Sequence, residues 1–255
     1  MIETLPPIKP WSGNTQNRCA FDAIPTYWKG FDVITFLADL GMYHPTLTNF
    51  LDEREKEQEQ KFKTEYFKKR FTTSRSIIKL ILFHILDTGN ISEIVLGKKK
   101  NGRLIVRGRK DLYISLSYSG TCIALSVGKR KFGSDIEMLR PVQIRKITSS
   151  PLFIDTHCRN GKEQNRALLQ LWTLVEAYAK LHNRNPYQIL KYPVLPEDAR
   201  FVSYCINQHA VFSLAFRSDL TSDALVWIDP ETLSSEIKNT ASYSTTFEGD
   251  TYVRA

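Results

Sequence analysis

The segment from Asn165 to Asn183 constrains the fold more than any other part of the chain. Apolar residues recur along it at the three- and four-residue steps of one helix face. They are Ala167, Leu168, Leu171, Leu174, Val175, Tyr178 and Leu181. On the same helix Trp172, Glu176 and Lys180 follow at four-residue steps and form a second row on the surface. The sequence therefore predicts a long amphipathic helix with one apolar face.

A second constraint is the stretch from Phe132 to Arg140, which contains Asp135 and Glu137 two residues apart. On a strand both carboxylates point to one face, and Ile136 between them points into the core. Two such carboxylates repel each other unless a cation or a cluster of hydrogen-bond donors lies between them, and Mg²⁺ with its preference for oxygen ligands suits this geometry. Gly133 allows a backbone or ligand to approach closely. On this fragment alone, two solvated acids on an edge strand remain the simpler interpretation.

The N-terminal part predicts two helices. Residues 1–30, rich in proline and aromatics, indicate an irregular lead-in, and Phe31 to Leu40 indicates a strand. Leu51 to Phe71 is dense in charge and predicts a mostly solvated helix, with a basic bias after Lys61. The run Thr72-Thr73-Ser74 supplies N-cap residues for an apolar helix that ends at Gly89.

In that arrangement Arg75 lies in the first turn of the apolar helix, where a cation is unfavourable unless an anion binds there. An arginine paired with a nearby glutamate is an equally good interpretation. The side chain is nevertheless marked as a candidate anion ligand.

Short strands make up most of the remaining chain. Asn101-Gly102 inside a basic run indicates a hairpin, and Ser117-Tyr118-Ser119-Gly120 a turn. The predicted strands are 104–106, 111–117, 122–127, 131–137, 200–206, 210–216 and 224–228. We therefore expect an α+β fold of two halves with similar element order, 31–130 and 131–228, and a frayed polar tail over 229–255.

Composition narrows the functional classes. The 255 residues carry a formal charge of +8, which favours anionic partners such as a phosphorylated molecule, an acidic protein surface or nucleic acid. No apolar run approaches the ~20 residues that span a bilayer, and the start lacks a signal-peptide pattern. Four scattered cysteines, Cys19, Cys122, Cys158 and Cys205, indicate reduced thiols. We expect a cytoplasmic protein that does not enter the membrane.

Three segments together carry a family resemblance. They are Asn101-Gly102-Arg103 with Ile114 to Gly120, then Gly133-Ser134-Asp135-Ile136-Glu137, and Trp172 to Lys180. Their order and spacing resemble the 4′-phosphopantetheinyl transferases of the surfactin-synthetase-activating type. In that family G-K-P and L-S-H-S segments precede G-x-D-x-E, and W-x-x-K-E-x-x-x-K follows. The resemblance covers roughly residues 50–216.

The resemblance implies a pseudo-twofold pair of similar α+β halves, each a helix packed on a small, mainly antiparallel sheet, with the active site at their junction. It implies a monomer that transfers the 4′-phosphopantetheine arm of coenzyme A to a serine of an apo acyl, peptidyl or aryl carrier protein, and releases 3′,5′-ADP. The implied Mg²⁺ ligands are Asp135, Glu137 and Glu176. The implied coenzyme A ligands are Lys63, Arg75, Arg103, Ser117, Tyr118 and Lys180. Catalytic roles fall to Asp135, Glu176 as general base, and Lys180 at the leaving group.

Departures from the family pattern keep alternatives open. Val175 stands where the family has lysine, Tyr118 replaces histidine and Arg103 replaces lysine. The nearest match to the family's F-x-x-x-E segment is residues 153–155. A transferase-like protein that binds coenzyme A or a carrier without turnover is therefore a second hypothesis. A nucleic-acid binder, suggested by Lys98-Lys99-Lys100, ranks well below both because no nucleic-acid motif accompanies the run.

Overall fold

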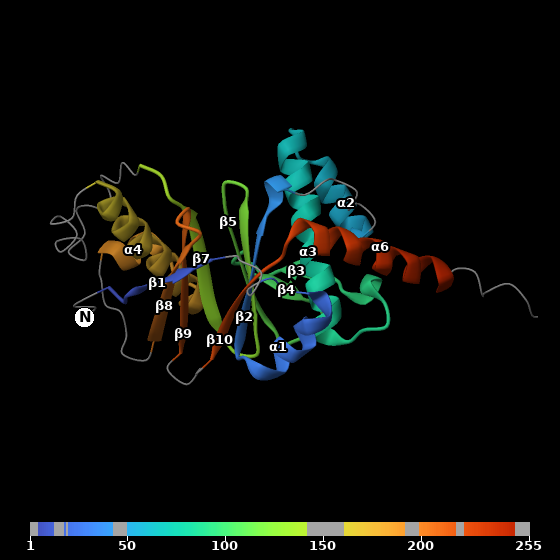
Figure 1. The fold of residues 1–255 in the computed structure, drawn as a ribbon. Coiled ribbons are helices and arrows are strands. Elements are labelled where there is room, and N and C mark those ends of the chain that lie inside the picture. Colours follow the sequence, from blue (N-terminus) through green and yellow to red (C-terminus); the bar gives the residue numbers. More distant parts are fainter. Residues whose placement is uncertain are drawn as a thin grey trace, which may run out of the picture.

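The computed structural model describes residues 5–12, 18, 20–42, 50–141, 161–191, 199–217 and 222–247. The helices are α1 (Ile24–Gly30), α2 (Glu53–Gln60), α3 (Glu65–Leu86), α4 (Gly161–His182), α5 (Pro186–Lys191) and α6 (Pro230–Phe247), with 3-10 turns η2 (Phe21–Ala23), η3 (Leu40–Met42) and η5 (Ile91–Glu93). The strands are β1 (Ile8–Trp11), β2 (Val33–Asp39), β3 (Leu96–Lys98), β4 (Leu104–Val106), β5 (Tyr113–Ser119), β6 (Cys122–Gly128), β7 (Phe132–Met138), β8 (Ala199–Ile206), β9 (Ala210–Arg217) and β10 (Asp223–Trp227). The predicted α+β class, with helices packed on small and mainly antiparallel sheets, is confirmed (Figure 1).

Two four-stranded sheets lie next to each other along their edges. One has the order β1-β8-β9-β7 and the other β10-β2-β6-β5. Their edge strands β7 and β5 meet at the junction, where backbone N–H groups of β7 donate to serine side chains of β5. The terminal strands exchange places. The N-terminal β1 pairs in parallel with β8, whereas β10, which follows β8 and β9 in the chain, pairs in parallel with β2. The sheets therefore do not follow the predicted halves 31–130 and 131–228 strand for strand, and the pseudo-twofold relation stays a prediction.

Helix α3 differs from the predicted pair of helices. It begins at the N-cap Thr64 and runs without a break to Leu86, where Asp87 in the left-handed region (φ 50°) ends it. Thr72, Thr73 and Ser74, predicted as N-cap residues, lie buried inside the helix. The hydroxyls of Thr72 and Ser74 do not break it because they have acceptors: Ser74 Oγ donates to the carbonyl oxygen of Phe71 at 2.9 Å, and Thr72 Oγ1 donates to Glu59 Oε1 of α2.

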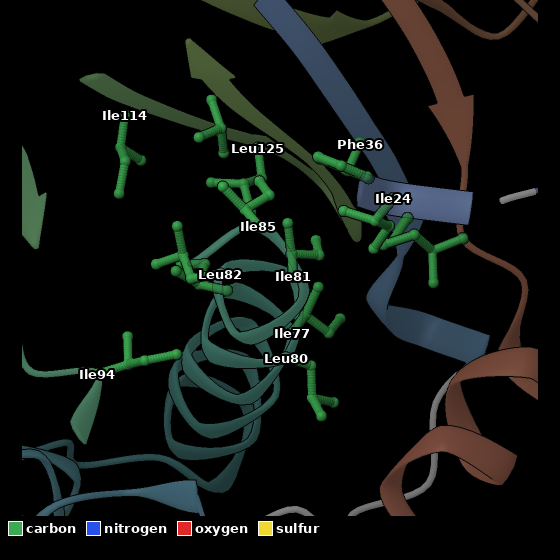
Figure 2. Close-up of a cluster of buried hydrophobic side chains, with 14 of the residues drawn as sticks. Ile24, Phe36, Ile77, Leu80, Ile81, Leu82, Ile85, Ile94, Ile114 and Leu125 are labelled. Carbon is green, nitrogen blue, oxygen red and sulfur yellow. The ribbon is translucent and has the colours of Figure 1, made fainter. Parts of the chain in front are cut away.

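The larger apolar core lies between α3 and the β10-β2-β6-β5 sheet (Figure 2). Ile77, Ile78 and Ile81 of α3 are fully buried against this sheet, which contributes Phe36 and Leu125. A second core lies under α4, which packs on β7 and β9 and buries the predicted apolar stripe. Within the described ranges, no helix is long and apolar enough to cross a bilayer.

The described residues near both chain ends form more regular structure than the composition indicates. The predicted irregular lead-in contains β1, η2 and α1. The predicted frayed tail contains α6, whose Leu233 is 1% exposed and whose Ile237 packs on the larger core. For residues 230–247 the tail prediction was wrong, because Leu233 and Ile237, spaced i, i+4, pack an otherwise polar helix on the core. Residues 248–255 lie outside the described part of the chain. Asp229 caps α6 by accepting from the backbone N–H groups of Glu231 and Thr232, both at 3.0 Å.

Candidate active site

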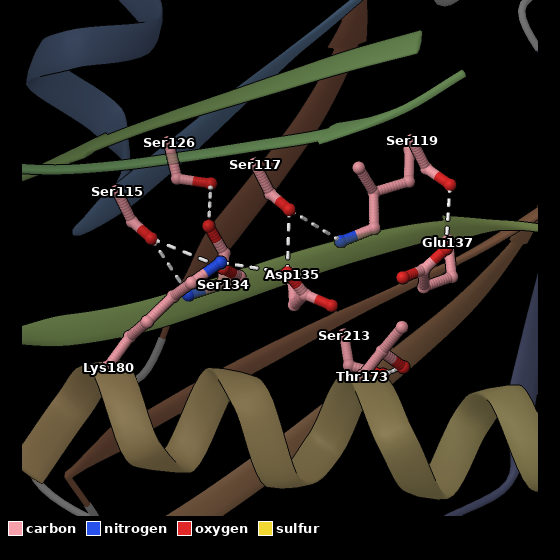
Figure 3. A network of polar contacts seen from close by, with 11 residues as sticks. Ser115, Ser117, Ser119, Ser126, Ser134, Asp135, Glu137, Thr173, Lys180 and Ser213 are labelled. Atoms are coloured by element: carbon pink, nitrogen blue, oxygen red, sulfur yellow. Dashed lines mark hydrogen bonds and ion pairs between the residues drawn. The ribbon is translucent and has the colours of Figure 1, made fainter. Parts of the chain in front are cut away.

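The contact between α4 and β7 is set by a glycine. A Cβ atom added to Gly133 would lie 2.0 Å from the carbonyl oxygen of Ala177 and 2.6 Å from the backbone nitrogen of Leu181. The helix backbone therefore rests directly on the strand, closer than any side chain at position 133 allows. The close approach expected at Gly133 is that of α4, and it brings Lys180 over β7 (Figure 3).

Lys180 and Asp135 form an ion pair across this contact. The ammonium Nζ of Lys180 donates to Asp135 Oδ1 at 2.7 Å and to the carbonyl oxygen of Ser134 at 3.0 Å. Asp135 is 5% exposed, so this carboxylate relies on protein donors in place of water. The structure thus brings together two residues that the sequence places 45 positions apart.

Serine hydroxyls of β5 hold both acids of β7 from the opposite sheet. Ser117 Oγ donates to Asp135 Oδ1 at 2.6 Å, and Ser119 Oγ donates to Glu137 Oε2 at 2.7 Å (Figure 3). The segment 117–119 is the end of β5 and not part of the predicted turn, because it pairs with β6 as far as Ser119↔Cys122. Ser117, predicted to contact coenzyme A, is buried and bound to Asp135.

Glu176 of α4 faces Asp135 and Glu137, and these three residues are called the acidic group below. Its pKa is raised above the ordinary value of 4.5, first by burial and then by the negative charge of Asp135. Lys180 opposes this increase, and Glu137 adds to it. The three acids predicted from the sequence are therefore coupled electrostatically, although they come from two elements.

Asp135, Glu137 and Glu176 offer the oxygen ligands that a hard cation prefers, but they do not form a complete coordination site. Among the described residues no three acidic, histidine or cysteine side chains are close enough to form a ready-made metal group. Asp135 and Glu137 each have one carboxylate oxygen bound to a serine, and no described residue donates to the other oxygen. Two hydrogen-bonded carboxylates, with Glu176 nearby, fit the oxygen ligands that Mg²⁺ prefers.

A cavity of about 730 Å³ opens beside this acidic group. Its walls come from α2, α3, the β3–β4 hairpin, β5 and α4. Three acids, Asp52, Glu55 and Glu176, are outnumbered there by cations. The cationic side chains are Arg54, Arg70, Arg75, Lys98, Arg103, Lys180 and Arg184. Such a surface favours an anionic ligand of several charges.

The predicted site residues divide into three groups with respect to this cavity. Those that line it are Arg75, Arg103, Tyr118, Glu176 and Lys180. Those that do not line it but lie in or beside the acidic group are Ser117, Asp135 and Glu137. Lys63 is solvent-exposed in the connection between α2 and α3 and is not part of the described wall.

Arg75 lies near the middle of α3 and not in a first helical turn. It is 8% exposed, its Nε is 3.8 Å from Glu55 Oε1, and its guanidinium lies 5.1 Å from the centre of the Phe71 ring. Glu55 also accepts a 2.6 Å contact from the buried Lys79. Arg75 therefore has the nearby glutamate that the sequence analysis considered as an alternative to an anion, and it also faces the cavity.

Arg103 is held on the other side of the cavity. Its Nη2 donates to the carbonyl oxygen of Phe132 at 3.1 Å, and its guanidinium lies over the Tyr113 ring at 5.4 Å. The same hairpin is tied to the end of α4 by a 2.5 Å hydrogen bond from Asn101 to Asn183. The predicted Asn-Gly hairpin thus delivers a fixed guanidinium to the cavity wall.

Sequence reasoning missed Arg70. Its guanidinium lies 4.4 Å above the ring of Tyr118, whose pKa is raised by burial. Once α3 is treated as one helix from Glu65, Phe67, Arg70 and Phe71 fall on one face with Arg75, and this spacing identifies them. The expected N-cap at Thr72 hid the pattern.

The fold and the site define an α+β protein with a basic cavity that borders a coupled set of acids, an arrangement suited to a phosphorylated substrate. No protein-family model matches the chain. Over 103 residues the chain is 24% identical to the 4′-phosphopantetheinyl transferase psf-1 of Bacillus pumilus. The match covers 39% of this chain and 44% of that protein, less than half of its length. This likeness agrees with the predicted transferase class.

Proposed function

We propose that this protein transfers the 4′-phosphopantetheine arm of coenzyme A to the serine hydroxyl of an apo carrier protein and releases 3′,5′-ADP. The observation that carries the proposal is the position of Lys180. It touches Asp135 of the acidic pair and also lines the cationic cavity. A phosphorylated ligand in the cavity would thereby place its phosphates beside the acids. The similarity to a phosphopantetheinyl transferase supports the same reaction.

The residues supply what this transfer needs, which is positioning and charge neutralisation more than covalent participation. Lys180 has three N–H donors, and Asp135 and Ser134 take two of them. The third can bind an oxygen of the departing 3′,5′-ADP. Arg75, Arg103 and Tyr118 of the wall would bind the remaining phosphates of coenzyme A.

Asp135, Glu137 and Glu176 would hold Mg²⁺, which when bound supplies neutralising charge at the pyrophosphate. The raised pKa of Glu176 lies closer to neutral pH, and a carboxylate with a higher pKa is a stronger proton acceptor. Glu176 would take the proton from the acceptor serine. The net charge of +8 would favour encounter with an acidic carrier protein.

The test is the intact mass of apo acyl, peptidyl and aryl carrier proteins after incubation with this protein, coenzyme A and Mg²⁺. We expect one phosphopantetheine arm per carrier with the wild type and none with Asp135→Ala or Glu176→Ala. If several carriers stay unmodified although coenzyme A binds by calorimetry, the transferase proposal fails.

That outcome would favour a second candidate, a protein that binds coenzyme A or a carrier without turnover. The observation on its side is the 2.7 Å ion pair, because Lys180 already neutralises a carboxylate that a metal ion would need. Val175 is buried in the position where the family has lysine. Restoring Val175→Lys and Tyr118→His would then test whether lost groups account for the inactivity.

A further inference from the structure

The two sheets are joined at β5 and β7 by serine side chains in place of a backbone ladder. β5 has serine at every second position, Ser115, Ser117 and Ser119, so all three hydroxyls point to one side. They accept hydrogen bonds from alternate N–H groups of β7, those of Ser134, Ile136 and Met138, at 3.1, 3.4 and 2.9 Å. These bonds satisfy the β7 edge that β9 leaves unpaired.

The three hydroxyls differ in where they donate. Ser115 returns its proton to the backbone, to the carbonyl oxygen of Ser134 at 3.2 Å. Ser117 and Ser119 instead donate to the carboxylates of Asp135 and Glu137. Ser115 is therefore enough to show that the junction itself needs no carboxylate.

Ser119 is the closest described donor to the Glu137 carboxylate. Its Oγ lies 2.7 Å from Oε2, whereas Arg140, whose side chain is 65% exposed, lies 3.5 Å from the same oxygen. The hydroxyl is itself fixed, since it accepts from the Met138 N–H. A fixed donor selects one orientation of a carboxylate and leaves its second oxygen for another ligand.

We propose that Ser119 is a positioning residue for the acidic pair, and that it orients Glu137 as a ligand for a divalent cation. The inference rests on the proposed function, whereas the contacts from which it is argued are those of this chain. Lys180 and Ser117 orient Asp135 in the corresponding way. Ser117 and Ser119 would then serve as an outer layer of the cation site as well as a join between the sheets, whereas Ser115 serves only the join.

The test compares three variants of the full chain. Ser119→Ala removes the bond to Glu137 and the acceptor of the Met138 N–H. Ser115→Ala is the matched control, because it removes an acceptor from the same junction and touches no carboxylate; since Ser115 also lines the cavity, all variants are compared at saturating coenzyme A. Ser119→Thr keeps the hydroxyl. Binding of Mn²⁺ in the presence of coenzyme A is followed by electron paramagnetic resonance, and unfolding by urea.

We expect Ser119→Ala to weaken Mn²⁺ binding on the order of tenfold or more, while Ser115→Ala and Ser119→Thr bind as the wild type does. Both alanine variants should lose stability. Equal Mn²⁺ affinity of the two alanine variants, or no Mn²⁺ binding by the wild type, would overturn the inference. Carrier modification is measured separately, so wild type that binds Mn²⁺ but modifies no carrier refutes the proposed function and leaves the positioning role standing.

Discussion

Gly133 of β7 and Ala177 of α4 approach so closely that the carbonyl oxygen of Ala177 occupies the space of a Cβ atom. This contact fixes the distance between the strand that carries Asp135 and the helix that carries Glu176 and Lys180. The site therefore depends on a residue that contributes no functional group.

Gly133→Ala is expected to destabilise the protein by about 3 kcal/mol or more, at the upper end for overpacking, because the clash is with backbone atoms that cannot rotate away. Urea unfolding measures the loss. Gly89→Ala is the control, since a Cβ there meets no atom within 4 Å. Equal stability of the two variants would mean that α4 does not rest on β7 in this way.

The ion pair between Lys180 and Asp135 gives a double-mutant test. Lys180→Met leaves the buried carboxylate with Ser117 as its donor, and we expect a loss of about 1–3 kcal/mol. Asp135→Asn in the same background should restore part of that loss, with a coupling of about 0.5–3 kcal/mol. Independent, additive effects of the two substitutions would contradict a direct contact.

Replacing Glu176 by glutamine should have opposite effects on stability and on activity. Because its folded-state pKa is raised above 4.5, the native state binds more protons than the unfolded chain just above pH 4.5. Its contribution to the free energy of unfolding therefore falls as pH rises through that window and stays low above it. Glu176→Gln should remove this fall and be at least as stable as the wild type at pH 7.

The same substitution should lower the rate of carrier modification by about 10²–10⁴-fold, the range of general-base catalysis. It should also abolish the part of the pH–rate profile in which the rate increases with pH. A Glu176→Gln variant that keeps the wild-type rate would exclude Glu176 as the base.

Leu233 tests whether α6 belongs to the folded core. At 1% exposure, Leu233→Ala should cost about 2–4 kcal/mol of unfolding free energy. Ser234→Ala, on the exposed side of the helix, should change it by less than about 0.5 kcal/mol. If Leu233→Ala is also silent, the tail is frayed as its composition indicates.

The long helix, the acidic strand and the hairpin could be predicted from the sequence, because periodicity and turn chemistry are local. The junction of β5 and β7 could not be predicted, since the hydrogen bond between Ser119 and Glu137 depends on which sheet edges meet. The sequence also did not show that β1 pairs with β8 in one sheet and β10 with β2 in the other. Thr72 to Ser74 misled in a different way, because the capping propensity of hydroxyls was overridden by burial in a continuous helix.

The rate of phosphopantetheine transfer to an apo carrier, with coenzyme A affinity determined on the same preparations, tests the central claim most directly. The account predicts that the wild type produces holo-carrier and 3′,5′-ADP in equal amounts. Asp135→Asn and Glu176→Gln should lose transfer while they retain measurable coenzyme A binding. Transfer at the wild-type rate by either variant, or no transfer by a wild type that binds coenzyme A, would contradict it.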